Sequence, residues 1–103
     1  MKNITVQELK EKLKVKDSYI LLDCRTSGEY QKVHIDGSVL IPLHELQRRY
    51  QELNNQKEIL IYCRSGNRSR FAQEILLQNG FSKVSNVSGG ILEWIKNGYP
   101  VSG

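Results

Sequence analysis

The chain of 103 residues is 39% hydrophobic and 25% charged, the ordinary balance of a soluble globular protein. A chain of this length is expected to form one domain, spanning residues 1–103, around a single modest core. It contains no run of eighteen apolar residues, and its N-terminus lacks the apolar stretch of a secretory signal, so no membrane partner is expected. Two cysteines do not make a disulfide framework, and the expected location is cytoplasmic.

The formal net charge of +4 is concentrated in one short segment. Between Cys63 and Arg70 there are three arginines and no acidic residue. A nucleic-acid-binding protein more often spreads Lys and Arg over a face and places aromatic residues among them. The local charge therefore indicates a site for one small anion, and we expect no nucleic-acid partner.

The first half of the chain alternates predicted helices with short apolar strands. Thr5 and Glu8 have the spacing of a capping box, which predicts that a helix begins here. Its apolar face would carry Val6, Leu9 and Leu13. The next elements expected are a buried strand over residues 18–24, a short helix over 27–33 capped by Ser27, a strand over 39–41 stopped by Pro42, and a helix from Leu43 to Leu53.

The second half continues this alternation. Gly80 stands where the end of a helix takes a left-handed conformation, and Ile91, Trp94 and Ile95 are expected in the core. The elements expected are a buried strand over residues 58–63, a helix over 69–80 with Phe71, Ala72, Ile75 and Leu76 near one stripe, a weaker strand over 83–89, and a last helix closed by Gly98 and Pro100.

Repeated strand–helix units of this length predict an α/β fold, in which a mostly parallel sheet is covered by helices on both faces. In such sheets the functional crevice lies at the carboxyl ends of the strands. Two predicted strands, 18–24 and 58–63, end there in Cys24 and Cys63, and an arginine follows each cysteine. We therefore expect the site to form around these two segments.

The segment CRSGNRS, which begins at Cys63, leads from a predicted strand into a helix. Gly66 can take the positive φ of a tight curl, and the curled amides then form an anion nest at the amino end of the helix. Such surroundings lower a thiol pKa from about 8.5 to about 3.5–7.5, which makes a separate general base unnecessary. Arg64 and Arg68 are expected to steer and hold an anionic substrate, and Ser69 to cap the helix or donate to the sulfur. The alternative is a small buried cysteine before an ordinary polar turn.

Four segments resemble the motifs of the rhodanese-like sulfurtransferase family, in the same order along the chain. They are LLDCR, GEYQKVHIDGSVLIPL, YCRSGNRS and GGILEWIKNGYPV, and together they span nearly the whole sequence. The resemblance implies a single rhodanese-like domain with an α/β sheet of about five strands. Val33, Asp36 and Ser38 depart from the usual residues at one turn, and Cys24 stands where valine is more common.

The resemblance also implies a chemical cycle. Cys63 would be the catalytic nucleophile, take a sulfane sulfur from thiosulfate or a related small anionic donor, and pass it from a persulfide to a thiol or cyanide. No metal or organic cofactor is implied, and a monomer suffices. The residues expected to hold the substrate and persulfide are Arg64, Ser65, Gly66, Asn67, Arg68 and Ser69, with Asp23 and Arg25 in supporting positions.

Two other functions stay open. The same persulfide would serve a sulfur-relay protein that receives sulfur from a cysteine desulfurase and passes it to another protein. A phosphatase or arsenate reductase also places a thiolate in an anion nest. Phosphoryl-transfer relatives, however, carry an arginine six positions after the cysteine, where this chain has Ser69.

The second cysteine raises a redox hypothesis. In the family's sheet the strands that end in Cys24 and Cys63 are neighbours, so a disulfide would protect or regulate Cys63 if the Cα atoms lie about 4.4–6.8 Å apart. A zinc site made of Cys24, His34, His44 and Cys63 is disfavoured, because no pair has the spacing of metal ligands.

The other polar residues receive structural roles. Asp23 is expected to bond loop amides, because an ionised carboxylate at the end of an apolar strand needs partners. Arg25 and Glu29, four residues apart, are expected to pair. His34 is expected to fix a turn, and Arg70 to point away from the site into solvent.

Overall fold

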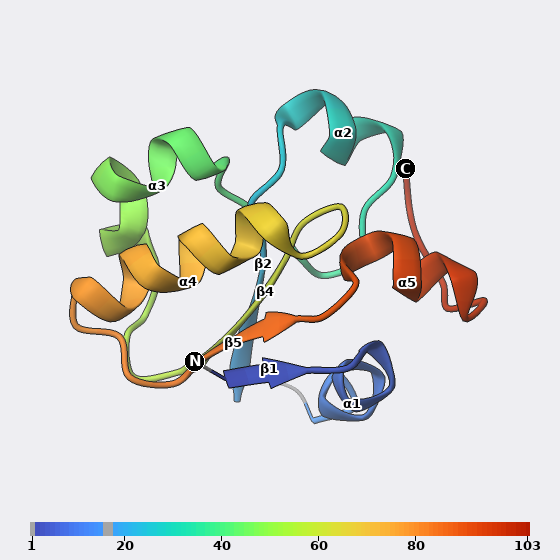
Figure 1. Ribbon diagram of the computed structural model, residues 1–103, viewed down its shortest axis with the longest axis horizontal. Helices are drawn as coiled ribbons and strands as arrows, with labels where there is room; N and C mark the ends of the chain where they lie inside the picture. Colours follow the sequence, from blue (N-terminus) through green and yellow to red (C-terminus); the bar gives the residue numbers. More distant parts are fainter. Residues whose placement is uncertain (1, 16–17) are drawn as a thin grey trace.

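The computed structural model describes residues 2–15 and 18–103, and its centre is a five-stranded sheet (Figure 1). The strand order is β1-β5-β4-β2-β3, and all neighbours in this sheet are parallel. This confirms the predicted α/β fold. The strands are β1 (Lys2–Ile4), β2 (Tyr19–Asp23), β3 (Val39–Leu40), β4 (Glu58–Tyr62) and β5 (Val84–Val87). The helices are α1 (Val6–Lys12), α2 (Ser27–Lys32), α3 (Leu43–Arg49), α4 (Asn67–Gln78) and α5 (Gly90–Lys96), with a short 3-10 helix, η1 (Tyr50–Glu52), after α3.

Helices cover both faces of the sheet, as predicted, because successive side chains of each strand point to opposite sides. On one face the core is formed by Leu22, Ile59, Ile61 and Val84 of the strands with Leu46 of α3 and Ala72 and Leu76 of α4. On the other face it is formed by Leu21, Leu60, Tyr62 and Val87 with Val6 and Leu9 of α1 and Ile91 and Trp94 of α5.

The helix boundaries follow local signals in the sequence. Thr5 and Glu8 form the predicted capping box: the Thr5 hydroxyl accepts from Glu8 N at 3.0 Å, and Glu8 Oε1 accepts from Thr5 N at 2.9 Å. Gly80 follows α4 with φ +91°, the left-handed conformation expected after a helix. In the described part of the chain, the helices are too short or too polar to cross a membrane.

Three predictions of local detail are wrong. Thr26, and not Ser27, caps α2, because its hydroxyl accepts from Glu29 N at 3.3 Å while Ser27 is the first helical residue. Phe71 was expected near the apolar stripe of its helix and Ile95 in the core, but they are 61% and 44% exposed. In α4 the stripe that faces the sheet passes through Ala72 and Leu76, and Phe71 falls outside it.

The first strand was not expected from the sequence. Lys2–Ile4 form β1, an edge strand that pairs with β5 and buries Ile4. A strand of three residues with one buried side chain is too short to show the alternation of apolar and polar residues that predicts a strand. The charged residues that follow it have the pattern of an exposed helix face.

The carboxyl ends of the parallel strands meet at one edge of the sheet. Cys24 leaves β2 there and Cys63 leaves β4. Backbone hydrogen bonds fix both segments: Leu43 N donates to Cys24 O at 3.0 Å, and Ile91 N donates to Cys63 O at 2.9 Å. The sequence patterns predicted the functional site at this edge of the sheet.

Candidate active site

Cys63 lies at the start of a tight curl between β4 and α4, and its side chain is 1% exposed. Gly66 closes the curl with φ +111° and is the N-cap of α4, which begins at Asn67, one or two residues before the predicted start. The predicted positive φ at Gly66 is therefore confirmed. The curl brings the sulfur back towards the first turn of a twelve-residue helix.

A backbone amide of the loop and a hydroxyl of the helix converge on this sulfur. Gly66 N donates to Cys63 Sγ at 3.0 Å, and Ser69 Oγ lies 3.4 Å from the same sulfur. The pKa of Cys63 is lowered to about 4. The largest cause is the hydrogen bond with the Cys24 thiol, and bonds from the Ser69 hydroxyl and from the amides of Ser69 and Gly66 add to it, while burial opposes them. The arrangement therefore favours a thiolate at neutral pH.

Asn86 connects these donors to the sheet. It belongs to β5 and is 3% exposed; its Oδ1 accepts the hydroxyl of Ser69, and its Nδ2 donates to Gly66 O at 3.3 Å. The sequence motifs did not single out Asn86. The available signal was an amide side chain inside a strand whose four residues are all buried, since a buried amide must find hydrogen-bond partners.

The amino end of α5 closes the loop from the other side. Leu92 N donates to Arg64 O at 3.1 Å, next to the bond between Ile91 N and Cys63 O. Gly90 permits this approach: it has φ +59°, and a Cβ on it would overlap the carbonyl oxygens of Cys63 and Arg64. In the sequence the pair Gly89-Gly90 stood out only as part of a motif, and its physical role appears only in the fold.

The arginines of the loop take different positions. Arg64 and Arg70 are exposed. Arg70 meets solvent as predicted, but it does not point away from the site, because it lines a polar hollow beside the loop. Arg68 reaches to α2, where its two terminal nitrogens donate to the two carboxylate oxygens of Glu29 at 2.7 and 2.8 Å. The expected pair of Arg25 with Glu29 is therefore wrong.

Arg25 pairs instead with Asp23 inside the protein. Arg25 Nη2 donates to Asp23 Oδ2 at 2.7 Å, and the two side chains are 3% and 0% exposed. Asp23 Oδ1 also accepts from Arg25 N at 2.9 Å, which is one of the loop amides expected for it. Arg25 Nη2 also donates to Val33 O at 2.6 Å, so this pair fixes the segment that follows α2.

Cys24 lies beside Cys63. Both thiols are free, both are 1% exposed, and both belong to the core on the α4 side of the sheet. The pKa of Cys24 is raised, first by its interaction with the neighbouring Cys63 sulfur and then by burial, and its thiol lies 3.5 Å from Tyr62 O, to which it donates. Cys24 also lines a hollow of about 320 Å³ together with residues that include Arg25, His44 and Arg68.

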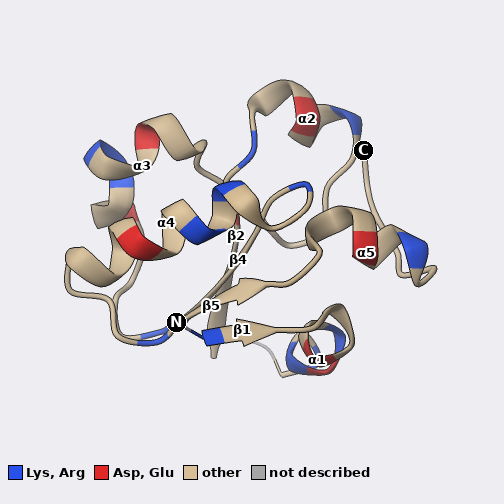
Figure 2. Cartoon of the chain, in the orientation of Figure 1, with Lys and Arg blue, Asp and Glu red and all other residues tan. Residues whose placement is uncertain are grey.

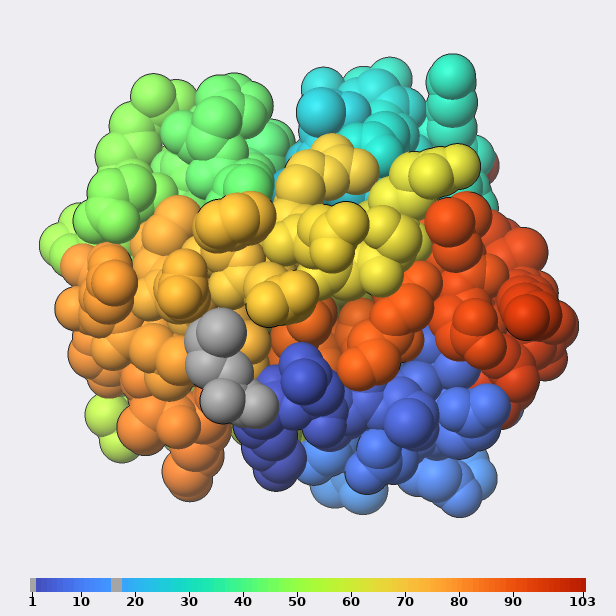
Figure 3. All heavy atoms as spheres, in the orientation of Figure 1, coloured from blue at the N-terminus to red at the C-terminus, as the bar shows by residue number. Residues whose placement is uncertain are grey.

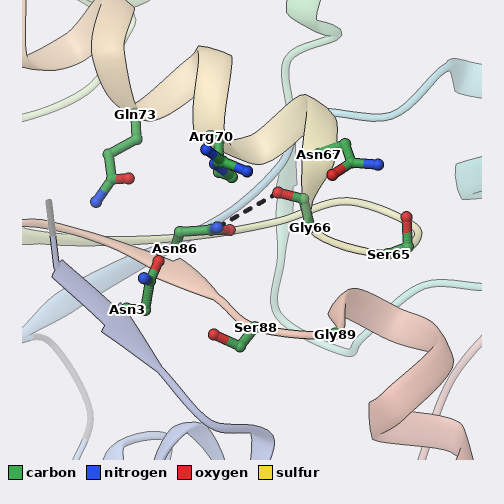
Figure 4. A pocket seen from close by; sticks show the side chains of 9 residues that line it. All are labelled: Asn3, Ser65, Gly66, Asn67, Arg70, Gln73, Asn86, Ser88 and Gly89. Carbon is green, nitrogen blue, oxygen red and sulfur yellow. Dashed lines mark hydrogen bonds between the residues drawn. The ribbon is translucent and has the colours of Figure 1, made fainter.

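A second, polar hollow of about 430 Å³ borders the same loop (Figure 4). Ser65, Gly66 and Asn67 line it from the loop and α4, and Asn86 lines it from β5. Cys63 is not among its lining residues. In the space-filling view the loop is the yellow segment between the cyan atoms of α2 and the orange-red atoms of α5 (Figure 3). The curl is thus at the surface, although its sulfur is buried.

The two histidines lie apart from the sulfur's hydrogen-bond partners. His34 Nδ1 lies 2.8 Å from Tyr30 O, its ring stacks on that of Tyr30, and its backbone bonds Ser102, so it fixes the turn as predicted. His44 Nε2 lies 3.4 Å from Glu45 Oε2. Within residues 2–15 and 18–103, no three His, Cys, Asp or Glu side chains gather closely enough to hold a metal ion.

A family model and the sequences of known proteins point to the same family. The model of the rhodanese-like domain matches residues 5–97. Among curated proteins, the "Putative sulfur carrier protein YrkF" of Bacillus subtilis is 43% identical over 91 residues, which are 88% of this chain and 49% of YrkF. A sulfurtransferase of Allochromatium vinosum is 34% identical over 98 residues, covering 95% of this chain and 92% of that protein. The chain therefore spans about half the length of YrkF and nearly all of the Allochromatium protein.

A solved structure extends the similarity to the whole fold. The crystal structure of a rhodanese-related protein from Thermoplasma volcanium superposes with a TM-score of 0.90 at 36% sequence identity. The match covers 99% of this chain and 98% of that one.

Proposed function

The chain belongs to the rhodanese-like domain family, and on this premise we propose that it is a sulfurtransferase in which Cys63 carries the transferred sulfur as a persulfide. The observation that carries the proposal is the convergence of Gly66 N and Ser69 Oγ on a buried sulfur at the amino end of α4. The lowered pKa of Cys63 favours the thiolate at neutral pH, so the proposed attack needs no separate base.

The first half-reaction uses this thiolate as a nucleophile. Cys63 attacks the outer sulfur of thiosulfate, the S–S bond of the donor breaks, and sulfite leaves with the electron pair. The new terminal sulfur of the persulfide is an anion, and the amides of the loop and the positive end of the α4 dipole favour it. In the second half-reaction a thiolate or cyanide attacks this terminal sulfur, and the electron pair returns to Cys63.

Positive charge around the loop favours a small anionic donor. Figure 2 shows Lys and Arg positions in the loop between β4 and α4 and along the first turns of α4. Arg64 is exposed and is free to meet a donor, while the charge of Arg68 is shared with Glu29. This distribution supports thiosulfate or a related sulfane donor as substrate.

The position of Ser69 favours sulfur transfer over phosphoryl transfer. Ser69 is the sixth residue after Cys63, and its hydroxyl lies beside the sulfur. A phosphate held there would lack the guanidinium that neutralises its oxygens in phosphoryl transfer. The chain therefore fits a donor that delivers one sulfur atom.

A second candidate is a sulfur carrier that is loaded by another protein. The name given to YrkF, which shares 43% identity with this chain, favours it. Loading by a cysteine desulfurase with cysteine, compared with loading by thiosulfate alone, separates the two functions. Loading by millimolar thiosulfate within one minute supports the enzyme, whereas loading only in the presence of the desulfurase supports the carrier.

The direct test is the intact mass of the protein a few seconds after mixing with thiosulfate. The wild-type protein and the control Cys24→Ser are expected to gain one sulfur atom, and cyanide is expected to remove it. Cys63→Ser is expected to gain none. An equal gain in Cys63→Ser would move the chemistry to Cys24 and contradict the proposal.

A further inference from the structure

Cys24 and Cys63 follow two strands that pair in register. β2 and β4 are parallel neighbours, with Asp23 opposite Tyr62, and Cys24 N donates to Tyr62 O at 3.2 Å, so the pairing continues to the cysteines. Cα atoms of neighbouring strands lie about 4.7–4.9 Å apart. Disulfides usually join Cα atoms about 4.4–6.8 Å apart, so the two cysteines are within disulfide reach.

The two side chains also share one environment. Each is 1% exposed, and both point to the α4 side of the sheet, into the cluster that contains Ile41 and Ile61. The donors that would hold a terminal sulfur, Gly66 N and Ser69 Oγ, come from the loop and α4. Cys24 comes from the end of β2 and not from the loop or α4. It therefore approaches the inner sulfur of a persulfide from a different side than the donors that would hold the terminal sulfur.

We propose that Cys24 is a resolving thiol: it attacks the inner sulfur of the Cys63 persulfide, closes a Cys24–Cys63 disulfide, and releases the transferred sulfur as hydrogen sulfide. This inference rests on the proposed function, because the persulfide must form first. It gives the protein a second activity, in which thiosulfate and two protein thiols yield sulfite, sulfide and a disulfide.

The step balances without an external oxidant. The S–H bond of Cys24 breaks and a bond forms between the two cysteine sulfurs. The bond from Cys63 Sγ to the terminal sulfur breaks, and the terminal sulfur leaves as HS⁻ with the electron pair and the proton of Cys24. The two cysteine sulfurs are oxidised and the sulfane sulfur is reduced, so the donor supplies the oxidising equivalents.

The charge state of Cys63 controls when Cys24 reacts. Before loading, the anionic Cys63 sulfur is the largest cause of the raised pKa of Cys24, so Cys24 stays a neutral thiol. In the persulfide the negative charge resides on the terminal sulfur, and Cys63 Sγ is neutral. The effect of an anionic Cys63 on Cys24 is then gone, while burial still favours the neutral thiol, so the proton leaves Cys24 only as the departing sulfur accepts it.

The hollow beside Cys24 gives the disulfide a route back to thiols. Cys24 lines the hollow of about 320 Å³ with Thr26, Leu43 and Arg68, whereas Cys63 does not line it. A small thiol that enters there meets the sulfur of Cys24 and expels the Cys63 thiolate. A thiol of lower pKa leaves faster, and Gly66 N and the Ser69 hydroxyl still lie beside the Cys63 sulfur and favour its thiolate, so this is the favoured direction of reduction.

A single-turnover experiment tests the proposal. Wild-type protein and Cys24→Val are mixed with excess thiosulfate in the absence of other thiols, and samples are quenched over time for intact mass and free sulfide. The wild-type protein is expected to gain one sulfur, and then to lose it with two hydrogens while one equivalent of sulfide appears. In Cys24→Val the persulfide is expected to last at least tenfold longer, with no matching release of sulfide.

The outcomes separate this inference from the proposed function. Persulfides that form in both proteins and decay at equal rates would overturn the role of Cys24 and leave the sulfurtransferase intact. If thiosulfate loads neither protein, the proposed function fails, and loading both proteins with inorganic polysulfide then tests Cys24 alone. A decay rate that rises with protein concentration would also contradict the proposal, because it would mark attack by a second copy of the chain. Peptide mapping of the wild-type product is expected to find Cys24 joined to Cys63.

Discussion

The hydroxyl of Ser69 lies 3.4 Å from the sulfur of Cys63 and also donates to Oδ1 of Asn86. A hydroxyl carries one proton, so Ser69 serves Asn86 or the sulfur at any moment. When Cys63 is an anion, it is the stronger acceptor. The charge on the sulfur therefore decides whether the Ser69 hydroxyl donates to Asn86 Oδ1 or to Cys63 Sγ.

Replacing Ser69 tests this relationship. Ser69→Ala removes one donor to the thiolate and is expected to raise the pKa of Cys63 by about one unit, because a hydrogen bond to a charged group contributes about 1.5 kcal/mol. The rate of iodoacetamide alkylation as a function of pH measures this pKa. Ser65→Ala is the matched control, since Ser65 is an exposed residue of the same loop. An unchanged pKa in Ser69→Ala would mean that the Ser69 hydroxyl donates to Asn86 Oδ1 even when Cys63 is ionised.

The ion pair between Arg68 and Glu29 is expected to weaken substrate attraction while it stabilises the fold. Glu29→Gln keeps a capping-box side chain on α2 but removes the charge that neutralises Arg68. We expect the KM for thiosulfate to fall about threefold and the free energy of unfolding to fall by about 1 kcal/mol. Steady-state kinetics and urea denaturation measure the two effects. Glu74→Gln, on the exposed side of α4, is the control, and a higher KM in Glu29→Gln would contradict the prediction.

The same pair predicts a dependence of stability on pH. The Arg68 guanidinium, through its hydrogen bonds, lowers the pKa of Glu29 from 4.5 to about 2. A carboxyl whose pKa is lowered by folding stabilises the protein above its unfolded pKa, and this contribution is lost as the pH falls towards 2. In Glu29→Gln the loss of stability between pH 5 and pH 2 is therefore expected to be smaller than in the wild-type protein. Parallel urea denaturation curves at several pH values measure it, and identical pH profiles would contradict it.

Gly90 is expected to be the glycine least tolerant of a side chain near the site. Gly90→Ala would push a Cβ into the carbonyl oxygens of Cys63 and Arg64, and should lower the free energy of unfolding by about 2 kcal/mol or more. Gly80→Ala is the control, because its φ of +91° is also positive but no atom lies within 4 Å of the place its Cβ would take, so only about 1 kcal/mol of backbone strain is expected. Urea denaturation compares the two, and equal losses would contradict the close packing at Gly90.

Sequence patterns predicted the fold because its strong signals are local. The strand that leads to Cys63 is apolar or aromatic from Ile59 onward, and both Thr5 and Gly80 act within one helical turn. The strand–helix alternation predicted the parallel direction of the strands. That β2 and β4 are neighbours was expected only from the family resemblance, and their pairing confirms it. The edge strand β1 was missed because its three residues bury only Ile4.

The partners of the site residues were harder to predict, because they come from distant segments. Spacing along the chain suggested that Glu29 pairs with Arg25, but the fold brings Arg68 to Glu29 from 39 residues away and leaves Arg25 with Asp23. Asn86 is 17 residues from Ser69, and no motif of the sequence joins them. Local chemistry predicts which groups need partners, and only the tertiary structure determines which partners they find.

The most direct test of the proposed chemistry is a titration of the Cys63 thiolate by its absorbance near 240 nm, with Cys63→Ser as the blank. A lowered pKa means that the thiolate is present above the folded pKa of about 4 and is lost as the pH falls through that value. We predict a midpoint near pH 4 and a constant thiolate signal from pH 6 to pH 8. A thiol that stays protonated beyond pH 8 would contradict this prediction and the chemistry that rests on it.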